Sequence, residues 1–123
     1  MEAQTSAQPA FYVINASTDD NQTGGNTEAT IDFQDDETNC FDTGGNFASD
    51  TFTAPVTGVY AFFTHVQVRG VTQESLGQFR IKRNSGGTPY TQADPDGAGY
   101  GGQYTFHLAS MFTLAANDTV TVT

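Results

Sequence analysis

One cysteine and two histidines are the residues of this sequence that could build a nucleophilic catalytic site. Such a site needs Cys40 or a serine beside a histidine and an acid. His65 and His107 both lie in segments with strand-like alternation, on the face opposite most of the large apolar residues, where a packed or hydrogen-bonded histidine is the common outcome. Cys40 has no basic neighbour in the sequence that would activate it. We therefore expect an idle or buried thiol and no enzymatic activity.

Acidic runs are the residues that could bind a metal ion. They lie in loop-like stretches at 19–20, 35–37 and 94–97, and calcium prefers hard oxygen ligands in such loops. Asp94 and Asp96, which flank a proline, are the candidate calcium ligands. No run has the full EF-hand pattern, so a solvated acidic loop is the alternative and calcium binding is expected to be weak or absent. No zinc spacing or phosphate-binding loop occurs, and no cofactor is expected.

The charge balance of the chain is strongly acidic. Asp and Glu number 14 against 4 for Lys and Arg, a net charge of -10, which disfavours binding to nucleic-acid phosphates or anionic lipid. The basic residues are Arg69, Arg80, Lys82 and Arg83, all within one short stretch. They predict a basic patch for docking to a negative partner. The alternative is that they are scattered strand-end charges that keep sheet edges soluble.

Apolar residues recur with a period of two, which is typical of strands with one face on a core. The clearest segments are 104–114 and 58–68, and a third, 119–123, follows a turn at 115–118. The predicted core residues are Tyr60, Phe62, Tyr104, Phe106, Leu108, Phe112 and Leu114. The segments 104–114 and 119–123 are predicted to form a hairpin.

Shorter strands are predicted at 10–15, 29–33, 51–54 and 78–82, separated by Gly-, Asn- and Asp-rich turns. No segment has a convincing helical face. Many short strands with glycine-rich turns favour an all-β sandwich or barrel. No apolar run approaches the length of a membrane-spanning helix, and residues 1–10 lack the pattern of a signal peptide.

The stretch from 52 to 62 reads Phe52-Thr53-Ala54-Pro55-Val56-Thr57-Gly58-Val59-Tyr60-Ala61-Phe62. Similar pieces flank it in order, at 10–11, 31–33, 39–42, 82–86 and 114–120. Together they resemble the complement component 1q globular-head family, the jelly-roll group related to tumour necrosis factor. The resemblance implies a two-sheet antiparallel jelly roll that assembles as a trimer, recognises other molecules through surface loops and has no enzymatic activity. The expected organisation is an N-terminal arm at 1–9 and one domain at 10–123. Members of the family usually continue through one or two more strands, so either those strands lie outside the given residues or the fold closes differently.

The same resemblance and the strand pattern predict a subunit interface. Residues 59–69 carry bulky groups on both faces, so one face covers the core and the other needs a partner. The predicted interface residues are Val59, Ala61, Phe63 and His65. The strand 119–123 is expected to lie at an exposed sheet edge. That edge would be shortened, covered by a neighbour or completed by a strand from a partner, or else the natural chain would continue with one or two further strands.

The expected function is that of a non-enzymatic trimeric structural or recognition module. A virion component, such as a phage capsid decoration or tail-fibre domain, suits an acidic jelly roll that cannot form an internal disulfide. The alternative is a secreted carbohydrate- or protein-binding domain. The expected partners are other copies of the chain, and then other virion proteins or a surface glycan or protein; neither nucleic acid nor membrane insertion is expected.

Overall fold

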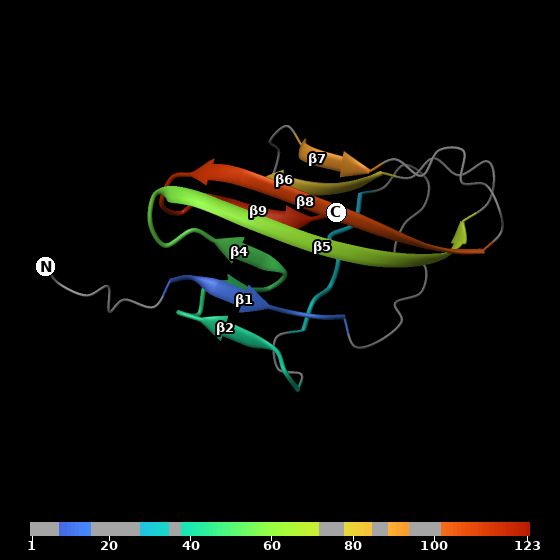
Figure 1. Cartoon of the computed structure of the whole chain (residues 1–123), viewed down its shortest axis with the longest axis horizontal. Coiled ribbons are helices and arrows are strands. Elements are labelled where there is room, and N and C mark those ends of the chain that lie inside the picture. The colour runs from blue at the N-terminus through green and yellow to red at the C-terminus, as the bar shows by residue number, and fades with distance from the viewer. Residues whose placement is uncertain (1–7, 16–27, 35–37, 72–77, 85–88, 94–101) are drawn as a thin grey trace, which may run out of the picture.

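The computed structural model describes residues 8–15, 28–34, 38–71, 78–84, 89–93 and 102–123. In this part of the chain every element is a β-strand (Figure 1). The strands are β1 (Ala10–Tyr12), β2 (Phe41–Thr43), β3 (Phe47–Ala48), β4 (Thr51–Thr53), β5 (Gly58–Val71), β6 (Phe79–Arg83), β7 (Pro89–Ala93), β8 (Gly102–Leu114) and β9 (Thr119–Val122).

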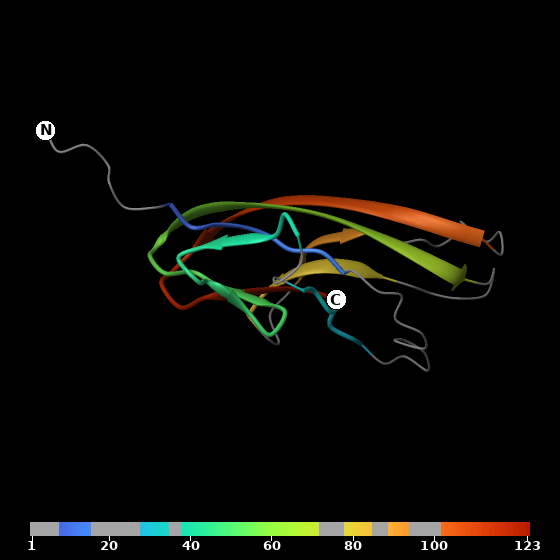
Figure 2. The same cartoon turned by 90° about the horizontal axis from the view of Figure 1, so that it is seen from below.

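The strands form two layers. One layer is a five-stranded antiparallel sheet with the order β3-β4-β9-β6-β7, and the other contains two antiparallel ribbons, β1-β2 and β5-β8 (Figure 2). The all-β prediction is therefore confirmed, and the layered arrangement is that of a β-sandwich.

The core lies between the two layers and is largely aromatic. Phe52 of β4 is in ring contact with Phe11 of β1 at 5.2 Å and with Phe62 of β5 at 5.4 Å. Phe79 of β6 stacks on Phe106 of β8 at 4.9 Å. The buried residues that form the core are Phe47, Phe52, Ala54, Phe62, Ile81, Leu108, Phe112, Leu114 and Val120. Both ribbons thus cover the same face of the five-stranded sheet.

Four of the predicted core residues are fully confirmed, namely Phe62, Leu108, Phe112 and Leu114. Tyr60 packs against the core in a partly buried position. Phe106 is also partly buried, against Phe79, and the side chain of Tyr104 lies outside the described part of the structure.

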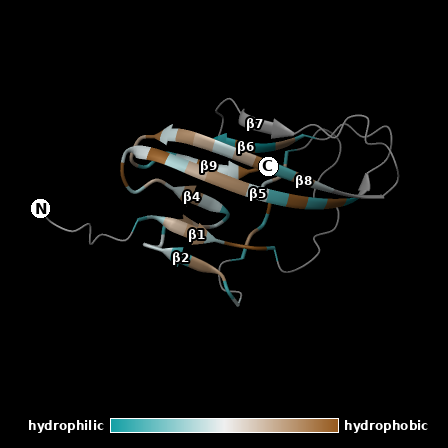
Figure 3. Cartoon of the chain, in the orientation of Figure 1, coloured by the Kyte–Doolittle hydropathy of each residue, from teal (hydrophilic) through white to brown (hydrophobic). Residues whose placement is uncertain are grey.

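The β5-β8 ribbon is a long, regular antiparallel pair. Its register runs from Gly58 opposite Leu114 to Arg69 opposite Gln103, and shifts between Arg69 and Val71. Side chains alternate between the core and the solvent along both strands, and Figure 3 shows the hydropathy changing along β5. Because directly opposite residues point to the same face, the outer face of the ribbon combines the odd-numbered residues of both strands.

Two predictions about β9 are wrong. β8 pairs with β5, whereas β9 pairs with β4 and β6, so β8 and β9 do not form a hairpin. The turn at 115–118 instead carries the chain from one layer to the other. β9 lies inside the five-stranded sheet, with a neighbour on each side, and is not an exposed edge.

The predicted strand at 29–33 is also wrong, since these residues form no strand. The segment nevertheless lies beside β9, because the Ile31 N–H donates to the Val122 carbonyl at 2.9 Å. Gln34 forms an isolated bridge with Ile14. The predicted strand at 10–15 is shorter than expected, since β1 ends at Tyr12.

Candidate assembly surface

The outer face of the β5-β8 ribbon exposes a row of mostly apolar side chains that ends at a pair of histidines. Opposite each other stand Val59 and Thr113, Ala61 and Met111, Phe63 and Ala109, and His65 and His107. We call these eight residues the outer strip. Val59, Phe63 and Met111 are 65%, 81% and 69% exposed. The four predicted interface residues therefore share one solvent-facing surface.

The centre of the outer strip is slightly hollowed. A shallow depression there is lined by Ala61, Phe63, Ala109, Ser110 and Met111. Its open shape and apolar lining do not resemble the enclosed site with converging polar groups that a small-molecule ligand requires. It is better suited to contact with another apolar surface.

The outer strip carries no Asp, Glu, Lys or Arg. The next pair along the ribbon, Gln67 and Thr105, is also uncharged, and the first charged residue beyond it is Arg69. In a chain with a net charge of -10, such a surface keeps like charges out of the contact itself.

The two histidines of the chain meet at one end of the outer strip. His65 and His107 are directly opposite in the register, and their ring centroids are 5.7 Å apart at an interplanar angle of 40°. Both are exposed. Neither an acidic residue nor a serine or cysteine stands beside them on the outer strip, so this surface lacks both the nucleophile and the acid of a catalytic triad.

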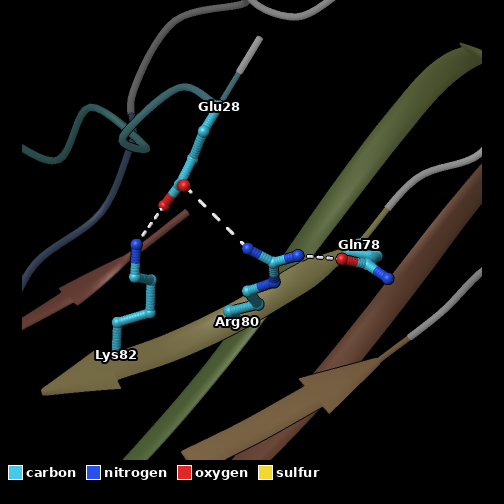
Figure 4. A network of polar contacts seen from close by, with 4 residues as sticks. All are labelled: Glu28, Gln78, Arg80 and Lys82. Carbon is cyan, nitrogen blue, oxygen red and sulfur yellow. Dashed lines mark hydrogen bonds and ion pairs between the residues drawn. The ribbon is translucent and has the colours of Figure 1, made fainter. Parts of the chain in front are cut away.

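The predicted basic patch is divided between surfaces. Arg80 and Lys82 lie on one face of β6, where both contact Glu28 (Figure 4). Arg83 follows on β6 with the alternate orientation, and Arg69 lies on β5, in the other layer. The structure therefore brings together two of the four residues and not the whole set.

Glu28 partly neutralises this pair. The Lys82 Nζ donates to Glu28 Oε1 at 2.5 Å, and the Arg80 guanidinium lies 3.9 Å from Oε2. Arg80 also donates to the Gln78 side chain. The hydrogen bond from Lys82, more than any other contact, lowers the pKa of Glu28 below its ordinary value. The pair is thus occupied by a residue of its own chain, and it offers less charge to an anionic partner than the sequence predicts.

The predicted calcium ligands Asp94 and Asp96 lie outside the described residues. Among the residues that are described, no group of three or more histidine, cysteine or acidic side chains gathers around a common point. Cys40 is partly buried, and its thiol lies 3.5 Å from the Gln34 carbonyl, to which it donates. In the same described residues there is no helix long and apolar enough to cross a membrane.

The sequence matches no protein-family model and no curated protein.

Sequence reasoning found one half of the outer strip and missed the other. It identified Val59, Ala61, Phe63 and His65 from the alternation along one strand. Their partners Thr113, Met111, Ala109 and His107 follow only from the register with β8. The signal for them was the second alternating segment at 104–114, whose odd positions gave the partners once the pairing was known.

Proposed function

We propose that this protein is a non-enzymatic structural or recognition module that associates with copies of itself through the outer strip. The observation that carries this proposal is the exposure of Val59, Phe63 and Met111 on one uncharged surface. Isolated exposed apolar residues are common on proteins, but a contiguous apolar patch marks an interaction site.

Burial of the outer strip would contribute favourable free energy to association. Burying one exposed Phe or Met side chain contributes about 1.5 to 3 kcal/mol, and every contacting copy contributes Phe63 and Met111. Association also costs translational and rotational freedom. Several such side chains are therefore needed, and the two strands provide them as a row.

A trimer of complement 1q-like jelly rolls is the assembly that we propose. The two-layer antiparallel arrangement, with a strand order that is not sequential, is compatible with a jelly roll. The segment at 52–62, which resembles the complement 1q heads, runs through β4 into β5, the strand that carries half of the outer strip. The proposal places the family's trimer contact on that strand.

A virion component, such as a capsid decoration or tail-fibre domain, is the setting that we favour. The single cysteine of the chain excludes an internal disulfide, and small secreted domains commonly depend on disulfides. A secreted recognition domain is the second candidate, supported by the likeness of segment 52–62 to the complement 1q heads. An image of the native assembly in its source distinguishes a particle surface from a free trimer.

The association is tested by measuring the molar mass of the purified protein by light scattering. We expect a trimer for the wild type and a folded monomer for Phe63→Asp, because the charge would be buried unpaired at the interface. Val56→Asp is the matched control, since Val56 is 59% exposed and lies outside the outer strip; this variant should keep the trimer. A folded wild-type monomer at micromolar concentration contradicts the proposal.

A further inference from the structure

The rings of His65 and His107 are spaced almost as closely as those of a two-imidazole chelate. They stand directly opposite on paired strands, where the side chains are held close together by the backbone. Two imidazoles bound to one ion through metal-nitrogen bonds of about 2.0 Å place their ring centroids about 5 Å apart. The observed separation is 5.7 Å, which is close to that spacing.

We propose that this histidine pair binds a divalent transition-metal ion, of the class of zinc or copper. Neutral imidazole is the commonest metal ligand in proteins and suits zinc, copper and nickel, whereas calcium and magnesium require oxygen ligands. The two rings supply two nitrogen ligands, and in a single chain water completes the coordination shell because both side chains are exposed there. The site is contained in one chain and does not depend on the proposed trimer.

The surroundings of the pair favour a cation that binds through nitrogen. On one side of it stand Phe63 and Ala109, and on the other Gln67 and Thr105. None of these four side chains carries a positive charge that would repel the ion, or a carboxylate that would draw it away from the rings. The net charge of -10 also raises the local concentration of cations around the protein.

The site is tested by titrating the full chain with Zn²⁺ in isothermal calorimetry, with excess Mg²⁺ present to occupy the carboxylates. We expect one ion per chain, and a loss of affinity of about tenfold or more in each of His65→Gln and His107→Gln. Cu²⁺ gives a second readout, because nitrogen coordination is visible in its electron paramagnetic resonance spectrum and should be lost in the double variant.

Two matched controls accompany these variants. Replacing the neighbouring pair, Gln67→Ala with Thr105→Ala, should leave zinc affinity unchanged. Val59→Asp changes the outer strip three cross-strand rows away from the histidines. This variant should bind the ion whether it is trimeric or monomeric, which separates metal binding from association. Equal zinc affinity in the wild type and in both single histidine variants overturns the proposal, as does the absence of nitrogen coordination to Cu²⁺.

Discussion

Asp42 shows how one carboxylate organises a turn. Its Oδ1 accepts the Asn46 N–H and its Oδ2 accepts the Phe47 N–H, both at 3.0 Å. Between them Gly44 and Gly45 have positive φ angles of 91° and 65°, which glycine adopts without strain. The carboxylate therefore fixes the turn that brings Phe47 into the core.

Asp42→Ala should lower the free energy of unfolding by about 1 to 3 kcal/mol, because two backbone donors lose their acceptor and one of them belongs to a buried residue. Urea denaturation measures the change. Asp42→Asn, which keeps one acceptor oxygen, should lose less. A wild-type midpoint for Asp42→Ala would show that water replaces the carboxylate at no cost.

Asp118 makes stability depend on pH. Hydrogen bonds from the Ala115 backbone N–H and then from the Asn84 side chain lower its pKa below the ordinary value of 3.8. A carboxyl with a lower pKa in the folded state stabilises the protein above its unfolded pKa, and this stabilisation is lost as the pH falls through the folded pKa.

The melting temperature of the wild type should therefore fall more steeply below about pH 4 than that of Asp118→Asn. Thermal unfolding at a series of pH values tests this difference. The two curves should converge at the acidic end, and parallel curves throughout would rule out the contribution of Asp118.

Buried positions in the strands stabilise the fold more than exposed positions do, and two valines allow a matched test of this difference. Val120 of β9 is 4% exposed and Val56, in the turn before β5, is 59% exposed. Val120→Ala should cost about 1.5 to 3 kcal/mol, and Val56→Ala should stay within about 0.5 kcal/mol of the wild type. Chemical denaturation gives both values, and equal losses would contradict the burial pattern.

The alternation along the sequence predicted the two long strands closely. Segment 58–68 corresponds to β5 and segment 104–114 to β8, and the faces assigned to Phe62 and Phe63 are confirmed. A period of two is a local signal, because successive side chains point to opposite faces wherever the strand lies. It therefore identifies buried and exposed faces well.

The same signal does not say which strands pair. The turn at 115–118 was compatible with a hairpin, but Asp118 caps it while the Asn117 N–H donates to the Ala54 carbonyl at 2.7 Å. This contact turns the chain toward β4 and away from β8. The histidine pair was equally hidden, since the meeting of His65 and His107 depends on a register between strands far apart in the sequence.

The whole molecule combines an uncharged outer strip with a net charge of -10. Copies that associate must overcome a long-range repulsion that salt screens. We expect the dissociation constant of the proposed trimer to fall as the ionic strength rises from about 0.01 M to about 1 M. Analytical ultracentrifugation across this range checks the trend. Weaker association at high salt would instead implicate ion pairs, with Arg69 as the nearest candidate.

The position of β9 also determines when the protein can fold. Phe52 and Thr53 of β4 pair with Val120 and Thr119 of β9, which lie far along the chain, and β6 pairs with the same strand. Contacts between such distant segments form slowly. During synthesis the five-stranded sheet therefore lacks its centre until β9 has left the ribosome, and the edges of β4 and β6 stay open to pairing with other nascent chains. The yield of folded protein should fall as the local concentration of nascent chains rises. This effect precedes assembly through the outer strip and does not depend on it.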